Sequence, residues 1–313
     1  MKLSLVIPCY NEAENVTAFQ NAAIKAFDGC GYDYELIFVD DGSRDATLNN
    51  LKKLYAQQAC PTKVIALSRN FGKESALYAG LQHAEGEYIC FIDADLQQRP
   101  ETVLKMVDIL KKSPEYDVVA ACQDRRGESK FLSLLKKGFY AAINRLSDVS
   151  LQSHASDFRT FRRCVADSIL SMGEYHRFTK GIFAWVGYST CYIPYTASQR
   201  NSGASKWSLG KLTGYAVDGI IGFSTKPLRL ATYTGTVTAI IALIYLVIVV
   251  MEKLTKGIDI PGYATIIVLI LLLGGIQLLC IGIIGEYVGK IFEQSKDRPI
   301  YIAKEILDYK NSK

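Results

Sequence analysis

The sequence lacks the short motifs that mark several large protein classes. None of its eight cysteines forms a CxxC pair, and Cys9 and Cys90 stand in apolar runs where a reduced thiol is a small hydrophobic group, so we expect no disulfide framework. Neither GxGxxG nor GxxxxGK(S/T) occurs, which removes the main support for dinucleotide-binding and P-loop NTPase functions. Repeats and low-complexity stretches are absent, and the apolar part of the opening "MKLSLVIPCYNE" is too short for a signal peptide.

Two long runs, residues 230–251 and residues 260–285, contain no charged residue. Each is longer than the about 20 helical residues that cross a hydrocarbon core, whereas buried core helices seldom continue beyond about 14 apolar residues. We therefore predict two membrane spans. Basic residues are concentrated outside the pair, which predicts that both termini are cytoplasmic. The flanking basic residues are Lys211, Lys226, Arg229, Lys290, Lys296, Arg298 and Lys304, against Lys253 and Lys256 in the connecting loop.

Ahead of the spans, apolar β-branched runs alternate with helical patterns. The alternation predicts βαβ units and an α/β fold whose mainly parallel sheet is covered on both faces. The strand-like runs are residues 3–8, 35–40, 63–68, 88–93 and 117–122, and the helical patterns are residues 13–27, 45–58, 72–84 and 100–112. We expect this domain at residues 1–226, the paired spans at residues 227–290 and a cytoplasmic tail at residues 291–313.

Polar residues follow each predicted strand. The five strand ends read "PCYNE", "VDDGSRD", "SRNFGKE", "DADLQ" and "CQDRR". In open α/β sheets, ligands bind in the crevice at the carboxyl ends of the strands. These polar residues are therefore expected at one edge of the sheet, where they could form a binding site.

Two aspartates follow the fourth strand. Asp93 and Asp95 are two residues apart, so on a strand they would point to the same face, where close carboxylates repel each other. A divalent cation removes that conflict, and oxygen ligands favour Mg²⁺ or Mn²⁺ with substrate phosphate completing the shell. We predict a metal site from Asp93, Asp95 and Gln97. The competing interpretation is a solvated turn, where Asp is common.

Other strand-end residues have two interpretations. Carboxylates of "VDDGSRD" and the Ser43 hydroxyl could hydrogen-bond a ribose or base, or Ser43 and Asp45 could cap the next helix. Basic residues near the strand ends could bind phosphate or remain solvated, and they are Arg69, Lys73, Arg125 and Arg126.

Residues 125–145 are rich in basic residues with apolar ones at helical spacing. The pattern predicts a basic amphipathic helix at an anionic membrane surface. A solvated helix face explains the charges equally well in a soluble protein, and the downstream spans favour the membrane. The modest net charge of +5 gives no indication of a nucleic-acid partner.

Six stretches in order resemble a known family. "VIPCYNE", "VDDGSRDAT", "SRNFGKESAL", "DADLQQRPE", "SDFRTF" and "QRNSGASKWS", followed by two spans, are similar to the polyisoprenyl-phosphate glycosyltransferases of glycosyltransferase family 2. These are relatives of bactoprenol glucosyltransferases and dolichyl-phosphate mannose synthase. The resemblance covers almost the whole chain and implies a GT-A fold, which is Rossmann-like.

The resemblance also implies roles for individual residues. It implies Asp95, Gln97 and Asp93 at the metal, and Asp157, Asp93 and Arg200 as catalytic residues. From the resemblance and the strand-end pattern together, the expected nucleotide-sugar site comprises Pro8, Tyr10, Glu12, Asp41, Ser43, Lys73, Asp93, Asp95, Arg200 and Lys206. Whether Asp157 positions the acceptor, takes a residual proton or only pairs with Arg159 stays open.

The chain departs from the family pattern at two positions. Gln123 replaces the first arginine of an RxxR motif, so the acceptor phosphate is expected to contact Arg125, Arg126 and Lys137. Gln199 replaces an acidic residue that often precedes Arg200 in relatives, which loosens the expected orientation of that arginine.

The resemblance implies inverting, metal-dependent transfer of a sugar to a polyprenyl (undecaprenyl) phosphate at the cytoplasmic membrane. UDP-glucose is the expected donor, with UDP-N-acetylglucosamine, UDP-galactose and GDP-mannose as alternatives. It also suggests a homo-oligomer such as a tetramer. A membrane-tethered nucleotide-sugar sensor without turnover is the alternative from another class. A processive polysaccharide synthase would need several more spans and usually a QxxRW motif, and the chain has neither.

Overall fold

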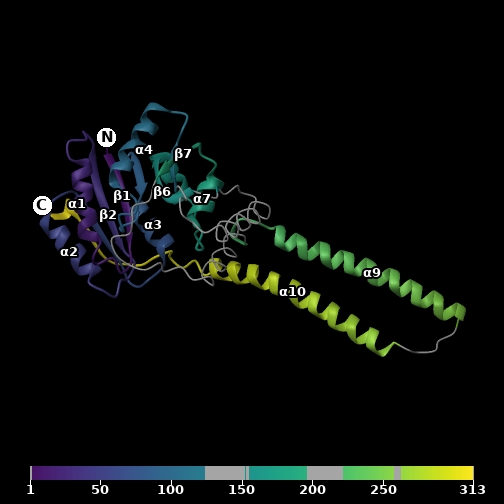
Figure 1. The fold of residues 1–313 in the computed structure, drawn as a ribbon. Helices are drawn as coiled ribbons and strands as arrows, with labels where there is room; N and C mark the ends of the chain where they lie inside the picture. Colours follow the sequence, from purple (N-terminus) through teal and green to yellow (C-terminus); the bar gives the residue numbers. More distant parts are fainter. Residues whose placement is uncertain (1, 124–151, 153–154, 196–220, 257–261, 313) are drawn as a thin grey trace.

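The computed structural model describes residues 2–123, 152, 155–195, 221–256 and 262–312. An α/β body carries both termini, and two long helices project from it as a hairpin (Figure 1). The predicted amphipathic helix at residues 125–145 lies outside the described residues.

The first four strands form the parallel centre of an eight-stranded sheet with the order β7-β5-β6-β4-β1-β2-β3-β8. The strands are β1 (Lys2–Cys9), β2 (Asp33–Asp40), β3 (Thr62–Leu67) and β4 (Tyr88–Phe91), with β1 between β2 and β4. They are connected through α1 (Val16–Phe27), α2 (Thr47–Gln57) and α3 (Lys73–Gln82), and α4 (Pro100–Lys112) follows β4. The predicted βαβ units are confirmed.

The remaining strands widen this sheet on both sides. They are β5 (Val118–Gln123), β6 (Ala155–Arg162), β7 (Thr190–Tyr195) and β8 (Ala303–Asp308). Strand β6 inserts antiparallel between β4 and β5, with Arg159 opposite Phe91. Because β6 is antiparallel, its first residues lie at the carboxyl end of β4. This topology brings Asp157 to the predicted edge.

Helices cover both faces of the sheet. Side chains of a strand alternate between faces, so Leu5 and Ile7 pack with α1 and α4 while Val6 packs with α3 on the other face. Two further helices, α6 (Arg163–Leu170) and α7 (Thr179–Val186), cover that second face. Burial of each large apolar side chain stabilises the fold by about 1.5–3 kcal/mol, which explains the near-continuous apolar runs of the central strands.

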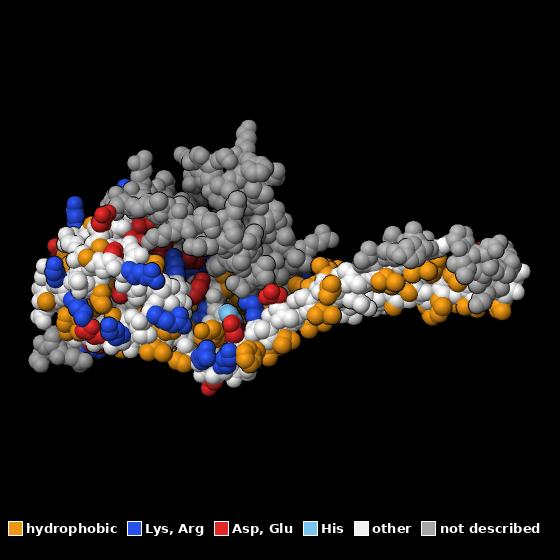
Figure 2. Space-filling view, turned by 90° about the horizontal axis from the view of Figure 1, so that it is seen from below, with side chains coloured by type: hydrophobic (Ala, Val, Ile, Leu, Met, Phe, Trp, Pro, Cys, Tyr) orange, Lys and Arg blue, Asp and Glu red, His pale blue; other side chains and the backbone are white. Residues whose placement is uncertain are grey.

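The projecting helices are α9 (Lys226–Lys256) and α10 (Tyr263–Ser295). Both contain a segment long and apolar enough to cross a membrane, at Lys226–Glu252 and Leu272–Ser295. A soluble core helix would be buried and a signal sequence would lie near the N-terminus, whereas neither segment is buried and both lie in the last third of the chain. Hydrophobic side chains line the hairpin, and Lys and Arg gather over the α/β body (Figure 2).

The segment after the hairpin, which we expected to be a tail, returns to the sheet. Strand β8 pairs antiparallel with β3, and Ser68 N donates to Ile302 O at 2.9 Å. A single sheet therefore contains strands from before and after the hairpin, so both ends of the hairpin meet the same body.

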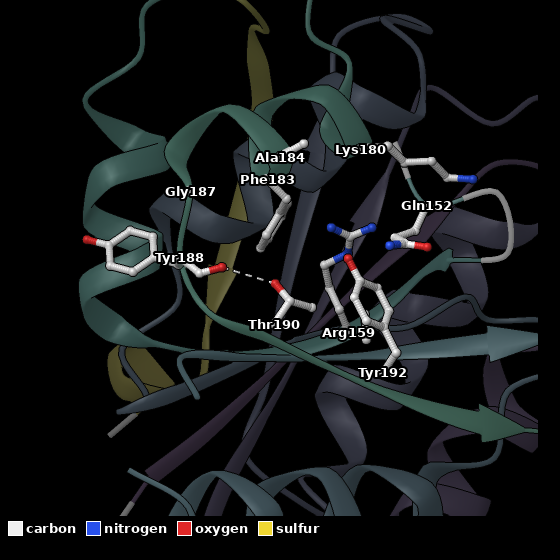
Figure 3. Close-up of a pocket in the computed structure, with 10 residues that line it drawn as sticks. Gln152, Arg159, Lys180, Phe183, Ala184, Gly187, Tyr188, Thr190 and Tyr192 are labelled. Carbon is white, nitrogen blue, oxygen red and sulfur yellow. Dashed lines mark hydrogen bonds between the residues drawn. The ribbon is translucent and has the colours of Figure 1, made fainter. Parts of the chain in front are cut away.

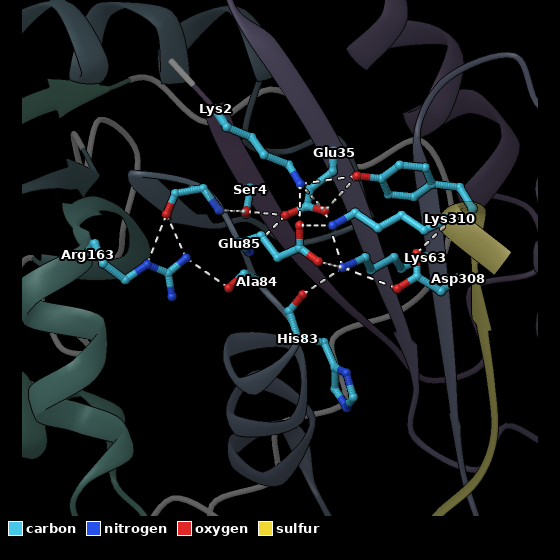
Figure 4. A network of polar contacts seen from close by, with 12 residues as sticks. Lys2, Ser4, Glu35, Lys63, His83, Ala84, Glu85, Arg163, Asp308 and Lys310 are labelled. Atoms are coloured by element: carbon cyan, nitrogen blue, oxygen red, sulfur yellow. Dashed lines mark hydrogen bonds and ion pairs between the residues drawn. The ribbon is translucent and has the colours of Figure 1, made fainter.

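A buried charge network attaches β8 to the first strands (Figure 4). The Glu35 carboxylate is fully buried, accepts from Ser4 Oγ at 2.6 Å and lies 3.1 Å from Lys2 Nζ. Lys63, 3% exposed, lies 2.9 Å from Glu85 and 3.4 Å from Asp308 of β8. Each buried charge is thus compensated by an opposite one.

Replacing Lys63 by methionine is expected to destabilise the protein by about 1–3 kcal/mol, because it removes the cation that pairs with Asp308 of β8. Glu35 also loses one cation but keeps Lys2 at 3.1 Å. Thermal unfolding of the purified chain would measure the loss. Lys53→Met, an exposed position on α2, is the matched control and should change stability little. Equal melting temperatures for the two variants would show that the network does not hold β8.

Candidate active site

The loops after β1 and β2 are joined by hydrogen bonds at the carboxyl edge of the sheet. Asn11 N donates to Ser43 Oγ at 2.9 Å, and Arg44 N donates to Asn11 Oδ1 at 2.9 Å. Asn11 adopts a left-handed conformation with φ of 54°. Glu12 N donates to Thr47 Oγ1 at 2.8 Å, and Pro8 and Tyr10 lie half-buried beside this loop. The predicted nucleotide residues of these loops therefore share one platform.

The two aspartates at the end of β2 differ in what they contact. Asp41 accepts from the backbone N–H groups of Phe71 and Gly72 at 2.7 and 2.9 Å, which holds the loop before α3. Burial nevertheless raises the pKa of Asp41 to about 6. Asp40 Oδ1 is buried and has no hydrogen-bond partner among the described residues. Asp40 therefore offers an open acceptor, whereas the predicted ligand Asp41 positions a loop.

Glycine is required at Gly42, between these loops. Its φ is +64°, and an added Cβ would lie 2.4 Å from the backbone carbon of Arg69. Any side chain there would push the loops after β2 and β3 apart.

Three predicted residues from separate elements meet beside this platform, and we call them the Lys73 cluster. Lys73 Nζ, at the first residue of α3, lies 2.7 Å from Asp93 Oδ1 and 3.3 Å from Asp157 Oδ2. Asp157 Oδ1 is buried and has no hydrogen-bond partner among the described residues. The cluster thus presents one unused carboxylate oxygen.

Lys73 and Asp157 of this cluster are charged at neutral pH. Burial opposes the charge of Lys73, but Asp93 and Asp157 raise its pKa above the ordinary value. Burial likewise opposes ionisation of Asp157, but Lys73, Lys180 and Arg159 hold the pKa of that carboxyl at about 2. A carboxylate with so low a pKa is a poor proton acceptor at neutral pH and is better suited to positioning.

The "DADLQQ" segment is a turn, because β4 ends at Phe91. The predicted strand at residues 88–93 was therefore two residues too long, and the positions of Asp93 and Asp95 do not follow from the alternation of side chains on a strand. They are set by the turn, in which Leu96 has φ of 59° and Asp95 Oδ1 accepts from Gln97 N at 3.1 Å. Gln98, which the sequence did not single out, accepts from Asp93 N at 2.9 Å.

The donors at this turn fit a hard divalent cation that is shared with a substrate. Among the described residues, no three His, Cys, Asp or Glu side chains form a metal site by themselves. Mg²⁺ usually takes one or two carboxylates and completes its shell with water and substrate phosphate. The carboxylates of Asp95 and Asp93 supply oxygen donors of that kind, and Lys73 already engages one Asp93 oxygen. Asp95 and Asp93 could therefore hold such an ion together with a substrate phosphate, and the role of Asp95 as its main protein ligand stays a prediction.

Glu74 is a residue of the site that the sequence reasoning missed. Its Oε2 accepts from Thr179 N at 2.8 Å and from the Thr179 hydroxyl, which links α3 to α7. Burial raises the pKa of Glu74 to about 7, helped by the charge of Asp157. Only packing between the two helices reveals this role.

The raised pKa of Glu74 makes stability depend on pH. The contribution of the protonated carboxyl is complete below its unfolded pKa of about 4.3 and is lost as pH rises through about 7. Glu74→Gln keeps an acceptor for Thr179 and cannot ionise. We expect its melting temperature to be close to that of the parent at pH 4. At pH 8 it should exceed that of the parent by about 2–4 °C for each kcal/mol of stability that the parent loses on ionisation. Identical melting curves at both pH values would contradict the assignment.

A cavity of about 300 Å³ opens beside Lys73 and is lined on another side by Ile300, which follows α10. Arg177 lines it together with the Tyr175–His176 loop. Tyr175 N donates to Gln294 Oε1 at 2.8 Å, and His176 pairs with Glu293. The site therefore lies next to the end of α10.

Several predicted residues lie outside the described part of the chain. Their roles stay predictions, and they are Arg125, Arg126, Lys137, Gln199, Arg200 and Lys206.

Comparisons with known proteins agree with this geometry. Residues 4–170, more than half of the chain, match the model of glycosyl transferase family 2, and residues 226–291 match that of the GtrB C-terminal hairpin. The protein CsbB of Bacillus subtilis is 43% identical over 97% of this chain and 91% of its own length. The bactoprenol glucosyl transferase of Shigella phage SfV is 36% identical over 97% of this chain and 98% of its own.

Among solved structures, mannosyl-3-phosphoglycerate synthase from Rubrobacter xylanophilus has a similar fold, with a TM-score of 0.52 at 15% sequence identity, over 84% of this chain and 78% of that one. The predicted GT-A fold is confirmed. With a family model that matches most of the α/β body and relatives that align over nearly the full length, the chain belongs to glycosyltransferase family 2.

Proposed function

We propose that this chain transfers glucose from UDP-glucose to a polyprenyl phosphate at the cytoplasmic face of the membrane, with inversion at the anomeric carbon. The observation that carries the proposal is the Lys73 cluster next to Asp95, at the edge of a GT-A sheet whose chain continues into two apolar helices. A relative of similar length is named bactoprenol glucosyl transferase, which supports the choice of sugar and lipid.

The topology supports placing the site at one membrane face. Strand β8 follows the hairpin and belongs to the same sheet as β1, so a hairpin that crosses the membrane must return to the side of the α/β body. Basic residues flank the body side of both helices, which favours the cytoplasm. A lipid acceptor can reach the site from this face without leaving the bilayer.

The charges at the edge suit a diphosphate only with an added cation. The carboxylates of Asp93 and Asp157 share the one ammonium group of Lys73, and Asp95 adds a third carboxylate two residues from Asp93. A bound Mg²⁺ or Mn²⁺ supplies Lewis-acid stabilisation to the departing diphosphate. Asp95 would hold that ion, Lys73 would offset the two other acids, and the open oxygen of Asp40 would accept a donor from the nucleoside.

The acceptor needs little help from a base. A phosphate monoester has a second pKa of about 6 and is mainly dianionic at neutral pH, so it is already a nucleophile. The low pKa of Asp157 fits this requirement. We assign Asp157 a positioning role, in which Oδ2 is fixed by Lys73 and Oδ1 accepts a hydrogen bond from a substrate hydroxyl or from the protonated phosphate.

Transfer assays test the proposal. Purified full-length protein would be incubated with short polyprenyl phosphate, Mg²⁺ or Mn²⁺, and labelled UDP-glucose, UDP-N-acetylglucosamine, UDP-galactose or GDP-mannose. We expect a labelled lipid from UDP-glucose that EDTA abolishes. Product from another donor would correct the sugar, and no lipid-linked sugar from any donor would favour the non-catalytic sensor. Size measurement in detergent would test the predicted homo-oligomer.

A further inference from the structure

A second cavity, of about 310 Å³, lies between α7 and strands β5, β6 and β7 (Figure 3). Its volume is at the lower end of the about 300–1,000 Å³ typical of small-ligand sites. The ten described residues that line it include two cations, Arg159 and Lys180, and no acid. Aromatic rings of Phe183 and Tyr192 supply part of the remaining wall, whereas the Tyr188 ring turns away toward α6 (Figure 3). The lining suits an anion attached to an apolar group.

Arg159 is fixed in this cavity. It is 4% exposed, its guanidinium stacks 4.2 Å from the centre of the Phe183 ring, and its Nη2 donates to Ser156 O at 3.0 Å. The polar ends of Arg159, Lys180 and Tyr192 lie on the same side of the cavity as Gln152 (Figure 3). A preoriented guanidinium suits phosphate, because its planar fork of N–H groups can donate two parallel hydrogen bonds to phosphate oxygens.

Two short connections join this cavity to the Lys73 cluster. Arg159 and Asp157 are two apart on β6, so their side chains share one face of the sheet. Thr179 N donates a hydrogen bond to Glu74 Oε2. Since Glu74 follows Lys73 and Lys180 follows Thr179, this bond brings the start of α7 close to the cluster. The influence of Arg159 and Lys180 on the pKa of Asp157 agrees with this proximity.

The order of the strands indicates which of the two substrates, donor or acceptor, the cavity would bind. The nucleotide platform lies at β1 and β2, the metal turn follows β4, and Asp157 stands on β6. The cavity comes next, at β6, β5 and β7. A donor laid along this edge with its nucleoside over β1 and β2 would point its sugar toward the cavity. The cavity therefore suits the attacking group better than the leaving diphosphate.

We propose that Arg159 and Lys180 bind the phosphate of the lipid acceptor in this cavity, with the aromatic wall against the first part of its chain. The inference rests on the proposed function. It adds Arg159 and Lys180 to the acceptor-phosphate contacts that the sequence predicted at Arg125, Arg126 and Lys137. Lys180 is the better residue to change, because it is half-buried and Arg159 packs in the interior.

Binding is measured separately from turnover. Geranyl phosphate would be titrated into purified full-length protein saturated with UDP, with geraniol and inorganic phosphate as further arms. We expect Lys180→Met to weaken geranyl phosphate binding about tenfold or more, Lys180→Arg to restore it, and the Kd for UDP-glucose to stay unchanged. Lys53→Met is the charge-matched control, remote on α2.

The outcomes separate the two proposals. If the parent protein binds geranyl phosphate and transfers no sugar, the proposed function fails and the phosphate site stands. Unchanged geranyl phosphate binding in both Lys180→Met and Arg159→Lys would overturn the site. If Lys180→Met weakened geraniol binding as much as geranyl phosphate binding, the cavity would bind the lipid chain and not the phosphate. If only UDP-glucose binding were weakened, the cavity would belong to the donor, and either result would overturn the proposal.

Discussion

Replacing Asp95 by alanine is expected to abolish metal-dependent donor binding and to lower the transfer rate by about 10³-fold or more. Asp95 is buried at the turn after β4, and its carboxylate is the main protein ligand that we assign to the cation. Without it, charge that develops on the leaving diphosphate loses several kcal/mol of stabilisation. Thermal shift with UDP-glucose and Mn²⁺, beside initial rates, measures both losses.

The control for Asp95→Ala is Asp28→Ala, an exposed carboxylate at the end of α1. That variant should keep both the rate and the metal-dependent shift in melting temperature. If Asp95→Ala retained the shift seen for the parent with Mn²⁺, Asp95 would not be the metal ligand.

Replacing Asp157 by asparagine is expected to lower kcat by about 10²-fold, while the Kd for UDP-glucose stays close to that of the parent. Asparagine removes the charge that holds Lys73 Nζ at 3.3 Å from Asp157 Oδ2. A misplacement of the reacting groups by about 1 Å can lower the rate about 10²-fold. Steady-state kinetics with a saturating donor gives kcat, and titration calorimetry gives Kd.

The pH profile then distinguishes positioning from base catalysis. The pKa of Asp157 is about 2, so its carboxyl is ionised at every pH above 5. An acidic limb near pH 6 would come from the acceptor phosphate, and it should persist in Asp157→Asn. Loss of that limb with the substitution would identify Asp157 as the base.

The parallel half of the fold was predictable because strands buried on both faces are continuously apolar. Strands β6 and β8 were not predicted, since "SDFRTF" and "AKEILD" mix charged and apolar residues. That mixture fits the partly exposed edge strand β8, whereas β6 lies inside the sheet and buries its arginine, Arg159. The pairing of β8 with β3 depends on a contact between segments that lie far apart in the sequence. No local pattern contains that information.

The site was predicted in composition but not in arrangement. Lys73, Asp93 and Asp157 were each identified, yet their meeting depends on β6 running antiparallel to β4. The roles of Glu74 and Gln98 come from contacts across helices and within a turn, so residue type alone does not reveal them.

A structure of the full chain with UDP-glucose and Mn²⁺ in a lipid nanodisc tests most directly whether this edge is the catalytic centre. We expect Mn²⁺ between Asp95 and the diphosphate, the nucleoside over the loops after β1 and β2, and the sugar beside Asp157. Density for the diphosphate away from this edge, or an Asp95 carboxylate turned from the metal, would contradict the assignment.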